Sequence, residues 1–326
     1  IFLPTFNTVS GKQLSIDYLN LFFILKLSGL IIFTGILAGS YPAFFLSAFK
    51  PIHLLKEKMK SGSSGSIFRR ILVVVQFSIS IILIFITLIV FNQINFISSK
   101  KLGFEKENVV YIPIKDNMSN KYDVFKNELL SDPNILSVTT RGEGSTMISR
   151  RLVVQFEGED PESGIVMDCA RVGYDFFQTL NIDFIKGRPF SKDYPADMTD
   201  AFVINEEAAK QLGPRALAGQ RITVADRSGK IIGIVKNAHL RSLHHKIEPL
   251  IYFFLNDIGT NEINLYGIIL IKIKGDKISE AFSTINEKWS KINPTYPLEI
   301  SFLDQTYERL YHSENQIMTV FTYCAI

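Results

Sequence analysis

Two stretches of more than twenty residues in the first hundred contain no charged side chain, and the longer one covers residues 71–99. Two arginines come directly before this stretch, and two lysines follow it. At a rise of about 1.5 Å per residue, such a helix measures roughly 40 Å, whereas the hydrocarbon core of a bilayer is about 30 Å thick. The pattern therefore predicts a transmembrane helix over residues 71–99 that continues beyond the membrane as a stalk.

The shorter uncharged stretch, residues 27–49, is also long enough to span a bilayer. We predict a second transmembrane helix over residues 19–49. Gly35, Gly39 and Ala43 recur four residues apart on one face of it, which permits close packing against another helix. The ordinary frequency of glycine in membrane helices explains the same spacing equally well.

A weakly polar stripe marks the longer predicted helix. Gln76, Ser80 and Thr87 fall within about 40° of one another at 100° per residue. Because the span contains no ionisable residue, the stripe favours a helix-packing face over a transport path.

The segment between the two predicted helices, residues 50–70, is strongly basic. The positive-inside rule places so short a basic loop in the cytoplasm, so residues 1–18 and the chain after Lys100 are expected outside. The run of serine and glycine at 61–66 predicts a flexible linker. The residues that set this topology are Lys50, Lys56, Lys58, Lys60, Arg69 and Arg70.

From residue 100 to residue 312, short apolar runs alternate with turn-rich polar segments, which predicts a water-soluble α+β domain. Helices are expected over 122–130, 206–212 and 277–292, the second of them capped by Asn205. Strands are expected at 109–114, 151–156, 165–172, 201–204, 221–224, 230–235, 250–255, 266–274 and 298–303.

The two ends of the chain predict a fragment of a longer membrane protein. The chain begins with Ile1 rather than Met. Residues 313–326 have the pattern of the start of a further transmembrane helix, because the apolar run 317–326 is too short to span a bilayer.

Composition narrows the functional classes. A net charge of +3 over 326 residues is too small to favour nucleic acid as a partner, and the basic residues lie near the membrane segments. Cys169 and Cys324 lie far apart, so neither a disulfide framework nor a cysteine metal site is expected.

Two polar clusters contain residue types suited to enzyme chemistry, and both have a simpler interpretation. Three histidines and a glutamate suit zinc, but the H-E-x-x-H order is absent and an exposed loop is expected. Four clustered acids beside a glycine and a proline predict a solvated turn rather than a paired-carboxylate site. The clusters consist of His239, His244, His245 and Glu248, and of Glu157, Glu159, Asp160 and Glu162.

Two further candidates are also interpreted structurally. Cys169 lies in a β-like run and is expected to be a small core residue rather than a nucleophile. Residues 141–144 are expected from their composition to form a loop, and they lack the strand and helix context of a phosphate-binding site.

The order of motifs from residue 39 onward resembles the FtsX-like permeases of the MacB type. The membrane part contributes GSYPA (39–43), LSAFKP (46–51), FRRILVVVQF (68–77) and LGF (102–104). The outer part is similar to the MacB-like periplasmic core domain through YDFFQTL (174–180), GRPFS (187–191), VINE (203–206), IGIVK (232–236) and EP (248–249). QLGP at 211–214 departs from the aromatic-Gly pair that the family often carries.

The resemblance implies a non-catalytic permease subunit of an ABC transporter, multi-pass in the bacterial inner membrane, with its main domain in the periplasm. A partner ATPase would use ATP, so no cofactor is expected in this chain, and a periplasmic or outer-membrane partner is implied beside the lipid bilayer. Motion would pass through long helices to the periplasmic domain and drive export of peptide, lipoprotein or antimicrobial-type cargo. The chain would hold the last helix of one permease repeat and the start of a second.

A second functional class stays open. A membrane-anchored extracytoplasmic sensor, or a regulator of cell-envelope enzymes, has the same arrangement of helices and outer domain. Three further membrane helices after residue 326 would favour the permease, whereas a cytoplasmic signalling module there would favour the sensor.

Overall fold

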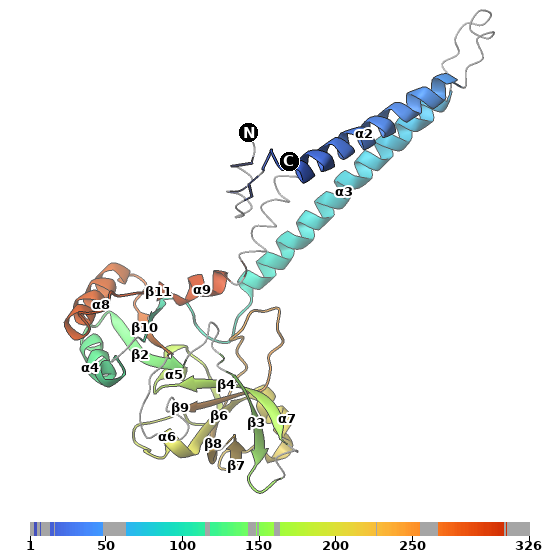
Figure 1. Ribbon diagram of the computed structural model, residues 1–326. Coiled ribbons are helices and arrows are strands. Elements are labelled where there is room, and N and C mark those ends of the chain that lie inside the picture. The colour runs from blue at the N-terminus through green and yellow to red at the C-terminus, as the bar shows by residue number, and fades with distance from the viewer. Residues whose placement is uncertain are drawn as a thin grey trace, which may run out of the picture. The chain divides into compact units, whose positions relative to one another are not determined.

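The computed structural model describes most of the chain in two compact units (Figure 1). The described residues are 3, 4, 7, 14, 15, 17–47, 63–114, 118–142, 148, 150–159, 164–225, 227–254, 267–309 and 311. The first unit comprises Ile1–Phe96 with Ser313–Ile326, and the second comprises Ile97–His312.

The first unit contains two long apolar helices, α2 (Leu21–Ser47) and α3 (Ser63–Ser99). Each has a stretch long and apolar enough to cross a membrane, Leu21–Ser40 with a mean hydropathy of 2.3 and Arg69–Phe96 with 2.8. None of either stretch is buried by protein. Because a soluble core helix would be mostly buried, the exposed apolar surface fits a lipid environment.

α3 begins earlier than the sequence predicts. Residues 63–70, expected in the linker, form its first two turns. The physical reason is that extending an existing helix adds one hydrogen bond per residue fixed, so a long helix can propagate through weak helix formers such as serine and glycine.

The second unit is built on one mixed sheet, part of which closes on itself. Six of the described strands form a ring in the order β4-β3-β7-β8-β6-β9, and β9 closes it by pairing in parallel with β4. These strands are β3 (Arg150–Phe156), β4 (Ile165–Val172), β6 (Ala201–Asn205), β7 (Arg221–Val224), β8 (Arg227–Val235) and β9 (Leu250–Phe254). Alternate residues of each strand point inward and fill the ring with an apolar core that includes Met167, Phe202 and Ile251.

Four further strands extend this ring as an open sheet covered by two helices, whereas β5 (Phe184–Gly187) pairs with β8 of the ring (Figure 1). The order is β11-β1-β10-β2, and β2 joins β4 of the ring through the pair Arg141 and Val172. The strands are β1 (Val109–Pro113), β2 (Ile135–Gly142), β10 (Gly267–Ile273) and β11 (Ser301–Phe302); the helices are α4 (Met118–Leu130) and α8 (Ile278–Ile292). Phe125 of α4 meets Trp289 of α8 edge to face at 5.7 Å.

Another apolar cluster joins the ring and the open sheet. It gathers aromatic side chains from several elements, among them Phe177 and Tyr252 with ring centroids 5.0 Å apart. Four short elements contribute to this cluster: α5 (Phe176–Thr179), β5, α6 (Asp197–Asp200) and α9 (Leu303–Arg309). Two others, α7 (Glu206–Leu212) and η3 (Gly213–Arg215), lie at the core of the ring, where Ala208 and Leu212 of α7 are buried. The expected α+β fold class is thereby confirmed, whereas β2, which contains two residues expected in a loop, was not predicted.

Candidate functional site

The loop between β8 and β9, residues 236–249, contacts both the segment that enters the second unit and the segment that leaves it. We call it the β8–β9 loop. The entering segment is residues 100–105, which follow α3 in the sequence. The amide of His239 in the loop donates a hydrogen bond of 2.7 Å to the carbonyl of Leu102 in the entering segment.

Gly103 brings the entering segment very close to the loop. Its φ of +82° lies in the left-handed region, and a Cβ at this position would collide with the carbonyl oxygen of Asn237. Glycine is therefore required here both for its backbone conformation and for the space it leaves.

Two tyrosines tie the same loop to the leaving segment, which is α9 with Tyr311. The Tyr307 hydroxyl donates to the carbonyl of Leu240 at 2.9 Å. The amide of Leu243 donates to the Tyr311 hydroxyl oxygen at 2.6 Å. The Tyr307 ring also packs against Phe104 of the entering segment, with centroids 5.4 Å apart.

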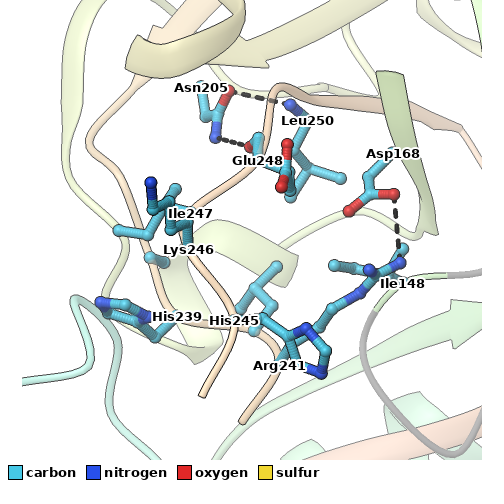
Figure 2. A pocket seen from close by; sticks show the side chains of 12 residues that line it. Ile148, Asp168, Asn205, His239, Arg241, His245, Lys246, Ile247, Glu248 and Leu250 are labelled. Atoms are coloured by element: carbon cyan, nitrogen blue, oxygen red, sulfur yellow. Dashed lines mark hydrogen bonds and ion pairs between the residues drawn. The ribbon is translucent and has the colours of Figure 1, made fainter. Parts of the chain in front are cut away.

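Asn205 anchors the far end of the loop to the ring of strands, as Figure 2 shows. Its Oδ1 accepts from the amides of Ala208 (2.8 Å) and Leu250 (2.9 Å), and its Nδ2 donates to the carbonyl of Glu248 at 3.0 Å. The first of these bonds confirms Asn205 as the N-cap of α7, and the other two hold the end of the loop at the start of β9.

Arg241 forms a second link to the ring by pairing with Asp168 of β4 (Figure 2). Oδ1 of Asp168 accepts from Arg241 at 3.1 Å and from Arg151 Nε at 3.0 Å. The Asp168 side chain is 1% exposed, so these two guanidinium groups compensate a carboxylate that burial alone would make very costly.

The loop and Asp168 enclose a small pocket, shown in Figure 2. Oδ2 of Asp168 has no hydrogen-bond partner among the described residues. The cavity volume of about 20 Å³ has room for about one water molecule, which would supply the missing donor. A pocket of this size is far too small for the drug-sized ligands that occupy roughly 300–1,000 Å³.

Burial and charge shift the pKa values of His239 in this loop and of Tyr307, which contacts it. Partial burial lowers the pKa of His239 below its ordinary value of 6.5, and the nearby charge of Lys100 acts in the same direction. Burial raises the pKa of Tyr307 far above its ordinary value, so this hydroxyl stays protonated and able to donate.

The candidate enzyme sites do not assemble in the described residues. These hold no group of three or more metal-ligating side chains, and His244, His245 and Glu248 are exposed. Glu157 pairs with Arg221 and Glu159 with Arg215, each at 2.6 Å, whereas Asp160 and Glu162 lie outside the described residues. Cys169 is fully buried, which confirms its place in the core.

The residues predicted for the membrane region lie on α2 and α3. Gly35 and Gly39 face open space, since a Cβ on either would meet no described atom within 4 Å, so their packing role stays a prediction. Gln76 and Ser80 are exposed on α3, and Thr87 donates its hydroxyl to the Leu83 carbonyl at 2.8 Å.

The basic residues predicted to set the topology are only partly described. Arg69 and Arg70 lie exposed on α3. The side chain of Ala43, together with Lys50, Lys56, Lys58 and Lys60 and the segment 313–326, lies outside the description.

Comparison with known families decides the identity of the second unit. Residues 73–281 match the family described as the MacB-like periplasmic core domain, which is 209 of 326 residues. The chain belongs to this family. The resemblance found in the sequence is thereby confirmed, and the MacB-like domain is the periplasmic part of permease components of ABC transporters.

Two solved structures are similar to the chain. The periplasmic region of MacB from Actinobacillus actinomycetemcomitans is 17% identical over 64% of this chain and 94% of its own, with a TM-score of 0.45. The extracellular domain of the noncanonic ABC-type transporter YknZ from Gram-positive bacteria is 12% identical over 59% and 97%, with a TM-score of 0.42. No curated protein matches the chain.

The contacts of the β8–β9 loop were not predicted from the sequence. Its partners Tyr307 and Tyr311 lie 67 and 68 residues further along the chain than the loop atoms they bind. A helix with tyrosines on one side was the available signal, but it does not indicate what those hydroxyls contact.

Proposed function

We propose that this chain is part of the permease subunit of a MacB-type ABC transporter, which exports its cargo with energy supplied by an ATPase on another chain. The observation that carries the proposal is the extent of the family match. It begins at residue 73, inside the apolar span of α3, and continues through the soluble unit to residue 281. MacB-type permeases work with an ABC ATPase partner.

The proposed place of the chain is the bacterial inner membrane, with the MacB-like domain outside the cytoplasm. Two apolar helices with unburied surfaces support a membrane location. The basic loop between these helices supports the orientation, because short loops rich in lysine and arginine stay in the cytoplasm.

The proposed division of labour gives this chain a mechanical role. ATP binding and hydrolysis belong to the partner, and the contribution of this chain is the movement of its periplasmic domain. The small pocket beside Asp168 has room for about one water, so we do not assign peptide or lipoprotein cargo to it. Cargo is expected instead on surfaces formed with a periplasmic or outer-membrane partner.

Co-purification tests this proposal. The protein is tagged, solubilised from native membranes in mild detergent and isolated, and the proteins bound to it are identified by mass spectrometry. The expected result is an ABC ATPase in stoichiometric amount, whose ATP hydrolysis changes when the chain is present. Recovery of a signalling kinase in place of an ATPase would overturn the proposal and favour the sensor.

A further inference from the structure

We propose that the β8–β9 loop is a coupling clamp, which makes the entering and leaving segments of the MacB-like domain move together with its ring of strands. This inference rests on the proposed function in one respect only, namely that a partner ATPase supplies the movement that opens or closes the clamp. The clamp itself is an arrangement of contacts within the second unit and can be tested in the chain alone.

The first step of the argument is that one short stretch of loop bonds to both segments. His239 donates to the entering segment, and Leu243, four residues later, donates to Tyr311 of the leaving segment. Leu240 lies between them and accepts from Tyr307. Three hydrogen bonds within five loop residues therefore link two parts of the chain that are about 200 residues apart in the sequence.

The second step is that this stretch of the loop is held in place by burial and by bonds to the ring of strands. Ala238 and Leu240 are 6% and 2% exposed and belong to the same apolar cluster as Phe104 and Tyr307. Arg241 pairs with the buried Asp168 on β4, and Asn205 fixes the end of the loop at β9. A displacement of either segment must therefore either move the ring with it or break the clamp.

The third step is that the clamp is built from weak, separable bonds. Its polar contacts to the leaving segment are two hydrogen bonds that involve tyrosine hydroxyls, and the His244 ring also meets the Tyr311 ring with centroids 5.8 Å apart. Such hydrogen bonds each favour the closed state by a factor of only about five. The clamp can therefore open locally without unfolding the strands around it, as segments of low local stability do. We infer a device that couples the two segments when closed and releases them when open.

Hydrogen–deuterium exchange of single amides in the detergent-solubilised chain tests the clamp. Tyr311→Phe removes the acceptor of the Leu243 amide on the leaving side. We expect this amide to exchange about fivefold faster, and we expect the His239 amide on the entering side to exchange faster as well. Acceleration at Leu243 alone, with His239 unchanged, would overturn the proposal, because the two sides would then open independently.

Tyr252→Phe is the matched control for this experiment. Tyr252 lies in the same apolar cluster, fully buried, and its hydroxyl has no hydrogen-bond partner among the described residues. Loss of the Tyr252 hydroxyl should leave the exchange rates of the Leu243 and His239 amides unchanged. Equal acceleration by Tyr252→Phe would mean that Tyr311→Phe acts by loosening the core in general. Protection of the amides of β3 and β7 reports whether each variant folds. If Tyr311→Phe does not fold, Tyr307→Phe removes the other hydroxyl that bonds to the loop and is used in its place.

A second arm separates this inference from the proposed function. With the partner ATPase bound and ATP added, the Leu243 and His239 amides should change exchange together in the wild-type chain. Tyr311→Phe should keep ATP hydrolysis and lose at least tenfold in transport. Absence of any bound ATPase would overturn the proposed function while leaving the exchange result on the isolated chain to decide the clamp.

Discussion

Gly103 occupies a position where both the backbone conformation and the available space require glycine. Its φ of +82° is a conformation that side chains with a Cβ rarely adopt, and the carbonyl of Asn237 occupies the place where that Cβ would go. Gly158 provides a comparison, because its φ of +86° is almost the same and a Cβ there would meet no described atom within 4 Å. The two glycines differ in crowding rather than in backbone conformation.

Alanine substitutions at these two glycines separate strain from crowding. We expect Gly158→Ala to destabilise the domain by about 1 kcal/mol, the cost of the left-handed conformation. Gly103→Ala should cost about 3 kcal/mol, because the loop must also move away from the entering segment. Thermal unfolding of the detergent-solubilised chain measures both. Equal shifts in melting temperature would mean that the Asn237 carbonyl moves aside freely.

At the scale of elements, the β8–β9 loop is expected to respond to pH through His239. Partial burial and Lys100 lower the pKa of this histidine below 6.5 in the folded chain. A lowered pKa means that the unfolded loop binds the proton more tightly. The loop is therefore most stable above pH 6.5 and loses stability as the pH falls below that value.

Histidine variants test this pH response. Exchange of the loop amides, corrected for the intrinsic effect of pH, should show less protection at pH 5.5 than at pH 7.5. His239→Asn should remove most of that difference, whereas His245→Asn should leave it in place because His245 is exposed on the same loop. A pH response that survives His239→Asn would assign the titration to another group.

The elements also show how far the sequence could predict this structure. β4 was predicted with its observed bounds, and α7 with its cap, because alternation and capping are local signals. β2 was missed because Ser137, Thr139 and Arg141 make it look like a loop. In the folded chain its hydroxyls are satisfied: Thr139 donates to the Tyr174 carbonyl at 2.6 Å, and Ser137 to Thr179 at 2.9 Å. Burial of hydrogen-bonded polar residues in a strand leaves no apolar pattern to recognise.

At the scale of the whole molecule, the closure of the ring depends on pairing between strands far apart in the sequence, which has no local sequence signal. The ring closes through β4 and β9, whose paired residues Asp168 and Leu250 are far apart in the sequence. Parallel pairing of this kind needs a long crossover and has no local turn signal. The clamp depends on the same closure, because Asp168 on β4 and Leu250 on β9 are anchor points of the β8–β9 loop.

The orientation of the chain in the membrane is the remaining prediction at this scale, and single cysteines test it. Lys210→Cys places a thiol on α7, where the lysine side chain is 79% exposed, and Ser63→Cys places one at the start of α3 beside the basic loop. In intact cells, a membrane-impermeant maleimide should label Lys210→Cys and leave Ser63→Cys unlabelled until the inner membrane is permeabilised. Of the two native cysteines, Cys169 is buried and Cys324 lies outside the described residues, so the unsubstituted chain measures the background labelling from both. Labelling of Ser63→Cys alone in intact cells would reverse the orientation. The MacB-like domain would then lie in the cytoplasm, where the positive-inside rule does not place it.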